Sequence, residues 1–327
     1  MMVTLVDFLF ILGLYFATIG LAFFFSWVGA WVFRKLSARL QARRGPPLVQ
    51  PVADIIKLFG KERFIPSFAN KFLYILSPLL ALSAILILSF MVPPGIPFWP
   101  GPLSWDLIVI LYFSVMFSLT FVIAGWASGS PWGKIGASRE VAIILSVELP
   151  LAIAILIPPL ALARGGYGFT LSINDVILAQ EGNFLWTILP NWFIFHYPFA
   201  AVALFLALLT KSWMRPFGDI PEAEQEIFAG PLTEYGGPLL GIFELARLFR
   251  FYVFTALFVD LYLGGGSGLI FPISILVFLL KCLIIIIIMT IIHVASARYR
   301  ISHVFKWFLT VCLAFALISL IRIVVGF

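Results

Sequence analysis

Long apolar segments alternate with short polar stretches along the whole of this chain. Eight of the segments are long enough to cross the hydrocarbon core of a bilayer, which takes about 20 residues of helix. They cover residues 5–33, 71–92, 104–126, 139–163, 190–210, 239–262, 270–292 and 303–326. The pattern predicts an all-α fold: a polytopic membrane bundle of about eight transmembrane helices, forming one integral membrane domain over residues 1–327.

Composition supports a membrane protein and excludes several kinds of site. The chain is 62% hydrophobic and 11% charged, whereas soluble domains carry about 25% charged residues. The first segment is too long for the core of a signal peptide, so we expect it to be retained as a span. Cys282 and Cys312 both lie inside apolar runs, where they form neither a cluster ligand set nor a disulfide framework. We therefore expect no metal, iron–sulfur cluster or other cofactor bound by this chain.

Lysine and arginine are concentrated in every second connection. They gather within residues 34–71, 134–139, 211–215 and 298–306, whereas the intervening connections carry only Arg164. Because cytoplasmic loops are enriched in these residues, we expect the four basic connections in the cytoplasm and both termini outside the cell membrane. The net charge of +6 then reflects topology, and we do not expect a nucleic-acid partner.

The connection after the first segment contains a predicted amphipathic helix over about residues 48–62. Its apolar positions recur with helical spacing on one face, at Leu48, Val52, Ile55, Ile56 and Phe59. Its polar positions lie elsewhere on the helix, at Gln50, Asp54, Lys57 and Lys61. Such a helix lies in the membrane interface. It either offers a surface where a soluble partner docks or only rests on lipid headgroups.

A second polar segment, over about residues 211–237, collects acids on the side that is predicted to be basic. The acids are Asp219, Glu222, Glu224, Glu226 and Glu234. Glu222 and Glu226 are four residues apart, so on a helix they would share a face and repel each other. This repulsion, with partial burial, would raise their pKa values and make them exchangeable proton carriers. A solvated acidic loop is the alternative that this pattern leaves open.

Ionisable residues also interrupt the apolar segments. Glu140 and Glu148 lie in the fourth segment, and Glu244 and Arg247 lie one helical turn apart in the sixth. A charge near the bilayer centre costs at least about 2.5 kcal/mol, so such side chains normally face a protein interior or water. We interpret them as candidates for an ion path, with a purely structural ion pair as the alternative for Glu244 and Arg247.

In combination, these motifs resemble one family over nearly the whole chain. The residues that carry the resemblance are Arg44-Gly45-Pro46, Gln50-Pro51, Asp54, Lys57-Leu58, Lys61-Glu62, Gly125-Trp126-Ala127-Ser128, Gly136-Ala137-Ser138-Arg139, Glu148, Pro221-Glu222-Ala223-Glu224-Gln225-Glu226 and Thr233-Glu234-Tyr235. The family is that of the membrane "heel" subunit, the H subunit, of the NADH:quinone oxidoreductase of respiratory complex I. It includes the equivalent subunits of energy-converting group 4 nickel–iron hydrogenases and of related archaeal sulfur-reducing membrane complexes. The short spacer Pro47-Leu48-Val49 is more similar to the hydrogenase branch.

The resemblance implies a membrane-anchoring and energy-coupling subunit that has no catalytic residue and is not itself the redox catalyst. It implies an iron–sulfur (small hydrogenase-like) subunit and a large hydrogenase-like subunit on the cytoplasmic face, and antiporter-like subunits in the lipid bilayer. Iron–sulfur clusters, and a nickel–iron site in the hydrogenase branch, would belong to those partners. The residues implied to dock partners are Arg44, Gln50, Asp54, Lys57, Lys61, Glu62 and Asp219. Those implied in the coupling or proton path are Glu140, Glu148, Glu222, Glu224, Glu226, Glu234, Glu244 and Arg247.

The sequence departs from the family pattern at two places in the implied path. Lys211 stands where the family has an acid, and Arg247 stands where it has a glutamate, with Glu244 one turn earlier.

Two other functions stay open. One is a quinone-chamber subunit of an NADH:quinone or ferredoxin:quinone oxidoreductase. The other is a free-standing secondary ion transporter, which would favour inverted repeats, and the sequence shows no clear repeat.

Overall fold

The computed structural model describes residues 5–95, 105–166, 168–182, 190–266, 269 and 271–325; the side chains of residues 5–12 and of Glu224 lie outside this description. All regular elements in these ranges are helices. The long ones are α1 (Leu5–Leu40), α3 (Lys71–Met91), α4 (Asp106–Ala127), α5 (Pro131–Arg164), α10 (Gly237–Tyr262) and α11 (Ile273–Ala295). A last helical run consists of α12 (Ile301–Trp307), the π-helical η3 (Phe308–Cys312) and α13 (Leu313–Val325).

Short helices occupy the connections. They are α2 (Gln50–Phe59), α6 (Ile173–Leu178), α7 (Phe193–His196), α8 (Pro198–Lys211), α9 (Glu224–Ile227) and the 3-10 helix η2 (Gly230–Leu232). The predicted surface helix is α2, shorter at both ends, because Pro51 fits only a first helical turn and the helix ends before Gly60. The predicted segment 190–210 is broken between α7 and α8, since Pro198 lacks the N–H that a helix interior needs.

Six helical runs in the described ranges are long and apolar enough to cross a membrane. They are α1 from Gly13 to Leu40, α3, α4, α5, α11 and the run Ile301–Val325. With 14 residues, α8 is about 21 Å long. The 26-residue α10 carries four charged side chains, Glu244, Arg247, Arg250 and Asp260. The multi-pass helical bundle is confirmed, whereas the number of eight spans stays a prediction.

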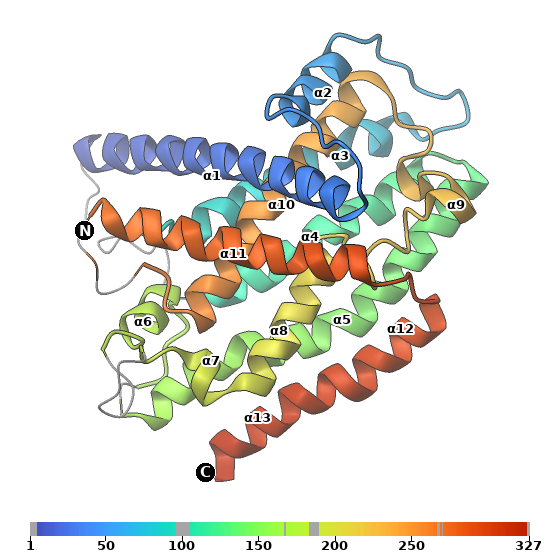
Figure 1. Cartoon of the computed structure of the whole chain (residues 1–327). Coiled ribbons are helices and arrows are strands. Elements are labelled where there is room, and N and C mark those ends of the chain that lie inside the picture. Colours follow the sequence, from blue (N-terminus) through green and yellow to red (C-terminus); the bar gives the residue numbers. More distant parts are fainter. Residues whose placement is uncertain are drawn as a thin grey trace.

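Successive connections lie at alternate ends of the bundle (Figure 1). The four connections predicted to be basic meet at one end, called the basic end, which comprises residues 41–70, 128–130, 212–236 and 296–300. There the Asn70 N–H donates to the Ala127 carbonyl at 2.9 Å, and the Tyr299 N–H donates to the Pro216 carbonyl at 3.2 Å. The other end is called the opposite end. This arrangement fits the alternation of charge, and the cytoplasmic location of the basic end stays a prediction.

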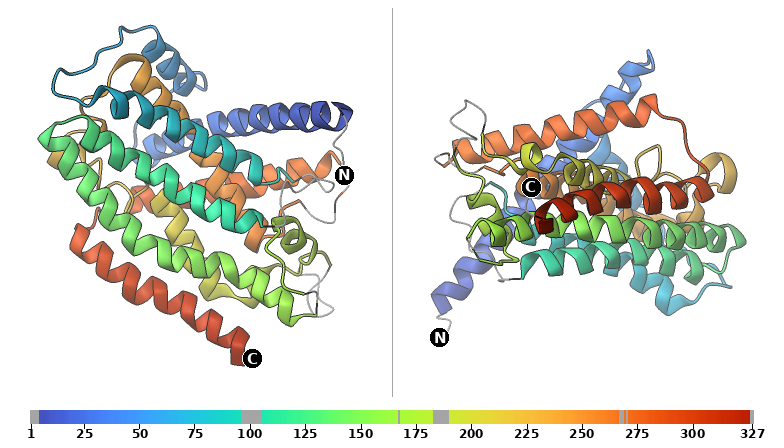
Figure 2. Two further views of the ribbon diagram at one scale, coloured as in Figure 1. Left: turned by 180° about the vertical axis from the view of Figure 1, so that it is seen from behind. Right: turned by 90° about the horizontal axis from the view of Figure 1, so that it is seen from below.

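Helix α10 forms the core of the bundle. It contacts α1, α3, α8 and α11, and every residue from Phe251 to Tyr262 is buried. Helices α3, α4 and α5 run side by side along one flank, as the view from behind shows (Figure 2). A helix whose faces are all buried is enclosed by other protein. Because α10 is enclosed in this way, its charged residues lie against protein or against internal cavities.

Candidate functional site

Two adjoining cavities lie at the basic end. The larger, called the α2 cavity, has a volume of about 480 Å³ and lies between α1, α2 and α10. The smaller, called the loop cavity, has a volume of about 320 Å³ and lies between α10, the segment 213–225 and the end of α11. Phe33, Glu244, Arg247 and Arg250 line both cavities. The charged side chains of α10 therefore border both spaces.

Helix α2 is tied to α1 through Asp54. Arg34 Nη1 donates to Asp54 Oδ2 at 2.7 Å, and Gln50 Nε2 donates to Asp54 Oδ1 at 2.7 Å. Burial raises the pKa of Asp54, but these hydrogen bonds and the charge of Arg34 outweigh it, so the pKa lies below its usual value. Ile55 is buried, whereas Ile56 is 65% exposed. The exposed side is available to lipid or to a partner, so both interpretations of α2 stay open.

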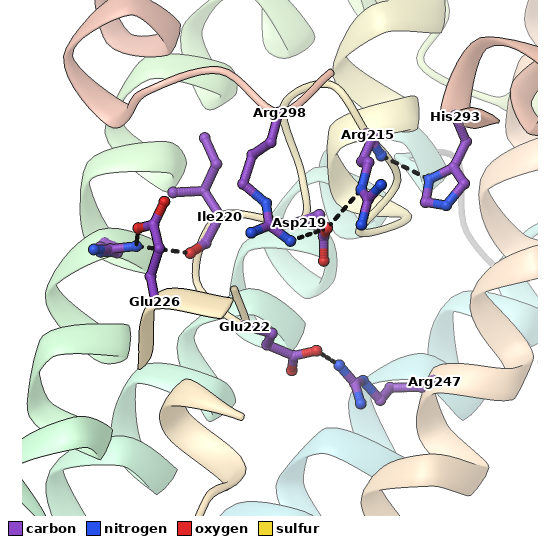
Figure 3. A network of polar contacts seen from close by, with 9 residues as sticks. Arg215, Asp219, Ile220, Glu222, Glu226, Arg247, His293 and Arg298 are labelled. Atoms are coloured by element: carbon purple, nitrogen blue, oxygen red, sulfur yellow. Dashed lines mark hydrogen bonds and ion pairs between the residues drawn. The ribbon is translucent and has the colours of Figure 1, made fainter. Parts of the chain in front are cut away.

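The predicted docking residues divide into two groups. Six lie on α2 or on the chain next to it: Arg44, Gln50, Asp54, Lys57, Lys61 and Glu62. Asp219 lies apart, because its Oδ2 accepts from Arg215 Nε at 3.0 Å and from Arg298 Nη2 at 2.5 Å (Figure 3). These bonds join the α8–α10 segment to the α11–α12 connection and engage the Asp219 carboxylate within the chain. The docking role of all seven residues stays a prediction.

Arg247 lies between two carboxylates at the border of the two cavities. Its Nη1 donates to Glu244 Oε1 at 2.7 Å, and its Nη2 pairs with Glu222 Oε2 (Figure 3). The side chains of Arg247 and Glu222 are each 16% exposed, and that of Glu244 is 33% exposed. The pairing of Glu244 with Arg247 was predicted from their spacing, and the structure adds Glu222 from the acidic segment.

The predicted repulsion between Glu222 and Glu226 is wrong, because the two residues do not share a helix face. Helix α9 begins only at Glu224, so Glu222 precedes it. Glu226 pairs instead with Arg139 Nη1 at 2.6 Å, on the exposed side of the loop. Each carboxylate therefore has its own arginine (Figure 3).

Trp213 and Arg250 complete the loop cavity, and neither was among the predicted site residues. The Trp213 ring centroid lies 5.2 Å from Cζ of both Arg247 and Arg250, a cation–π arrangement. Nε and Nη1 of Arg250 are buried without a hydrogen-bond partner among the described residues, so they are donors that a ligand could use. No group of three or more histidine, cysteine or acidic side chains in the described ranges could hold a metal ion.

A second buried cluster lies among α4, α5 and α8, next to Trp213. Lys211 Nζ pairs with Glu148 Oε1 and also donates to Ser118 Oγ at 3.2 Å. The side chains of Lys211 and Glu148 are 4% and 18% exposed. Glu140 is 4% exposed and borders the same small cavity as Lys211 and Trp213. Lys211, noted in the sequence only as a departure, is thus the direct partner of a predicted path residue.

The structure brings five of the predicted path residues to the two clusters that meet at Trp213: Glu140, Glu148, Glu222, Glu244 and Arg247. Glu226 lies at the exposed rim, and the side chain of Glu224 lies outside the described residues. Glu234 contributes its backbone carbonyl, which accepts from the Tyr74 hydroxyl at 2.6 Å and ties the acidic segment to α3. The participation of these residues in an ion path stays a prediction.

The fold and the site together define a class: a multi-pass helical membrane protein whose buried ion pairs extend from a charged cavity into the bundle. The family model described as NADH dehydrogenase matches residues 12–324. The H subunit of the NADH-quinone oxidoreductase of Chlorobaculum tepidum is 36% identical over 257 residues, 73% of this chain and 67% of that protein. The corresponding NADH-quinone oxidoreductase subunit of Protochlamydia amoebophila is 32% identical over 305 residues, 88% of each chain.

A solved structure gives the same result. A chain of the archaeal membrane-bound sulfane sulfur reductase, a respiratory membrane complex, matches with a TM-score of 0.82 and 27% identity, covering 94% of this chain and 98% of that one. The chain therefore belongs to the NADH dehydrogenase family, as a membrane subunit of the heel type found in complex I-related complexes. The family resemblance predicted from the motifs is confirmed.

Proposed function

We propose that this subunit anchors the peripheral redox subunits of its complex and couples their electron transfer to translocation of protons or sodium ions. The subunit does not carry out the redox reaction itself. The observation that carries the proposal is Arg247, which two carboxylates share at the border between the cavities and the bundle interior. An arginine that bonds to two carboxylates can release either of them, which would give the two-state element that coupling between distant sites requires.

The coupling operates through charge. Two unit charges about 10 Å apart interact by about 1.7 kcal/mol at an effective dielectric constant of 20. An electron that reaches a cluster docked at the basic end would therefore change a nearby proton equilibrium by more than about tenfold. When Arg247 contacts Glu222 alone, Glu244 takes up an ion. When Arg247 again contacts both carboxylates, Glu244 releases the ion. Trp213 lies against Arg247 and borders the cavity of Lys211, so the displacement extends toward Glu148.

The partners dock at the basic end, which faces the cytoplasm, and both termini lie outside. An iron–sulfur subunit and a large hydrogenase-like subunit contact α2 and the segment 212–236, and antiporter-like subunits pack against the bundle in the bilayer. Exposed Lys57 and Lys61 on the wall of the α2 cavity support this location. Similarity to a subunit of a sulfane sulfur reductase over 94% of the chain supports a complex of the sulfur reductase type. The short spacer Pro47-Leu48-Val49 is the feature that favours the hydrogenase branch.

A quinone-chamber subunit is the second candidate. The α2 cavity has a volume of about 480 Å³, within the range of roughly 300–1,000 Å³ that is usual for small-molecule sites. The relatives with the sequence identities given above are NADH-quinone oxidoreductase subunits. Photolabelling of the purified complex with an azidoquinone separates the candidates, because label on α1, α2 or α10 that excess quinone removes would favour the quinone chamber. A free-standing transporter is not favoured, since the relatives are subunits of complexes.

Glu244→Gln in the assembled complex tests the proposal. Electron transfer and the ion gradient are measured separately in reconstituted vesicles, with Glu222→Gln as a second variant. We expect electron transfer to persist and the gradient to fall in both. Asp175→Asn is the control, because this exposed carboxylate lies on α6, away from both cavities, and it should leave both activities unchanged. If Glu244→Gln and Glu222→Gln keep wild-type electron transfer and gradient, the pairs of Arg247 are structural and the coupling proposal is wrong.

A further inference from the structure

Asp260 is a buried acid far from the charged cavities. It lies near the end of α10 at the opposite end of the bundle, 0% exposed, and both carboxyl oxygens lack a hydrogen-bond partner among the described residues. The Gln180 side chain donates to the Asp260 backbone carbonyl at 3.0 Å and not to the carboxyl group. A Cβ on Gly265 would lie only 2.7 Å from Asp260 Oδ1. The carboxyl group is therefore enclosed by protein, and none of the described residues donates a hydrogen bond to it.

Lys281 on α11 is the positive charge next to this acid. Its Nζ donates to the carbonyls of Leu263 and Gly265, both at 2.7 Å, and lies 4.5 Å from the ring centroid of Trp192. This position closes the C-terminal end of α10, where a cation is favoured by the helix dipole. Lys281 interacts electrostatically with Asp260, yet no ion pair within 4.0 Å joins these two described residues. The other titratable groups that interact with Asp260 are Tyr252 and Cys282.

This arrangement differs from a direct salt bridge. In the pair of Glu148 with Lys211, the ammonium bonds directly to a carboxylate. Lys281 instead uses its donors on backbone carbonyls, so the Asp260 carboxyl group keeps its full capacity for a ligand. An ionised carboxylate that is buried without donors is strongly destabilised relative to the protonated acid. Lys281 already places one positive charge near Asp260, held on the carbonyls of Leu263 and Gly265, and it would repel a metal cation, so a proton is the ligand that this site favours.

We propose that Asp260 is an exchangeable proton-binding site at the opposite end of the bundle, with Lys281 as the fixed charge that balances the carboxylate. Binding and release are the single step in which the neutral acid gives a proton and leaves a carboxylate beside the Lys281 ammonium. Asp260 follows Glu244 by 16 residues on the same helix, which is about 24 Å. The inference rests on the proposed coupling function and extends it, because α10 then carries a titratable acid toward each end.

Infrared spectroscopy of the assembled complex tests the site directly. Aspartate labelled with carbon-13 in its side-chain carboxyl group is incorporated, and spectra are compared in water and in heavy water. We expect a carbonyl band of a neutral carboxylic acid that shifts in heavy water and is absent from the Asp260→Asn complex. If the wild-type band is missing, does not exchange, or remains in Asp260→Asn, the site does not exist. This result does not depend on whether the complex translocates ions.

Transport by the reconstituted complex tests the role of the site. Asp260→Asn should lower the ion gradient severalfold at unchanged electron transfer. Asp106→Asn is the matched control, because Asp106 is equally buried but lies in the first turn of α4, and it should leave both unchanged. An unchanged gradient in Asp260→Asn overturns the role. A wild-type complex without any gradient contradicts the proposed function instead. If Asp260→Asn does not assemble, Asp260→Glu decides, because the glutamate side chain is not labelled and the band should disappear from that variant too.

Discussion

The ion pair of Lys211 with Glu148 allows a quantitative test of the buried charges. Lys211→Met removes the ammonium and keeps an unbranched apolar side chain. Removal of one partner of a buried pair costs about 3–5 kcal/mol, because the other charge is left uncompensated. Glu148 is 18% exposed and its Oε2 has no hydrogen-bond partner among the described residues. We therefore expect the lower limit, about 3 kcal/mol.

The second variant, Glu148→Gln, separates charge from packing. In the double variant Lys211→Met with Glu148→Gln no charge remains, and neutral replacement of a buried pair costs little. The assay is thermal unfolding of the purified complex, where about 2 °C per kcal/mol predicts a midpoint roughly 6 °C lower for Lys211→Met. The double variant should recover most of this loss. Lys134→Met changes an exposed lysine of α5 and should not shift the midpoint.

Two results would refute this reasoning. If Lys211→Met unfolds at the wild-type temperature, the Glu148 carboxylate is solvated and the cluster is not a low-dielectric site. If the double variant is no more stable than Lys211→Met, the loss comes from the missing lysine stem and not from an uncompensated charge.

Three further predictions concern the basic end. Alanine at Asp54, Lys57 and Lys61 together should release the iron–sulfur subunit during gel filtration; a complete, active complex would mean that α2 only contacts lipid. Because the pKa of Asp54 is lowered, its link to α1 still holds at the usual aspartate pKa of about 3.9 and is lost only as the pH falls below that value; a spin label on α2 that loosens near pH 6 would contradict this. Gly237→Ala should cost about 1–3 kcal/mol in thermal unfolding, since Gly237 has φ +59° and a Cβ would meet the Glu62 carbonyl; an unshifted midpoint would show that the backbone adapts.

The helical bundle could be predicted because apolar length and the positions of basic residues are local properties of the sequence. The break at Pro198 was missed because the apolar run 190–210 is long enough to span, although the proline marks the start of a separate helix. The central position of α10 could not be predicted, since its burial depends on helices from distant parts of the chain that surround it. From the sequence, the charged residues of α10 indicate only that these positions do not face lipid.

The site was predictable only where partners are close in sequence. Glu244 and Arg247 are three residues apart, so helical spacing predicts their pair. Glu222 precedes α9, which begins at Glu224, and it pairs with Arg247 from outside that helix. Lys211 and Glu148 pair although they are 63 residues apart in the sequence. Neither contact follows from local pattern. The Trp213 ring lies close to two arginines. Its backbone has φ +49°, which few non-glycine residues adopt, and no motif predicts that conformation.

The central claim is that Arg247 changes carboxylate partner with the redox state of the docked subunit. The most direct measurement is cryo-electron microscopy of the assembled complex, prepared fully oxidised and fully reduced, with the side chains around Arg247 resolved in both. We predict that Arg247 contacts Glu222 and Glu244 in one state, as in the present structure, and only one of them in the other. Identical contacts in both states would contradict the account.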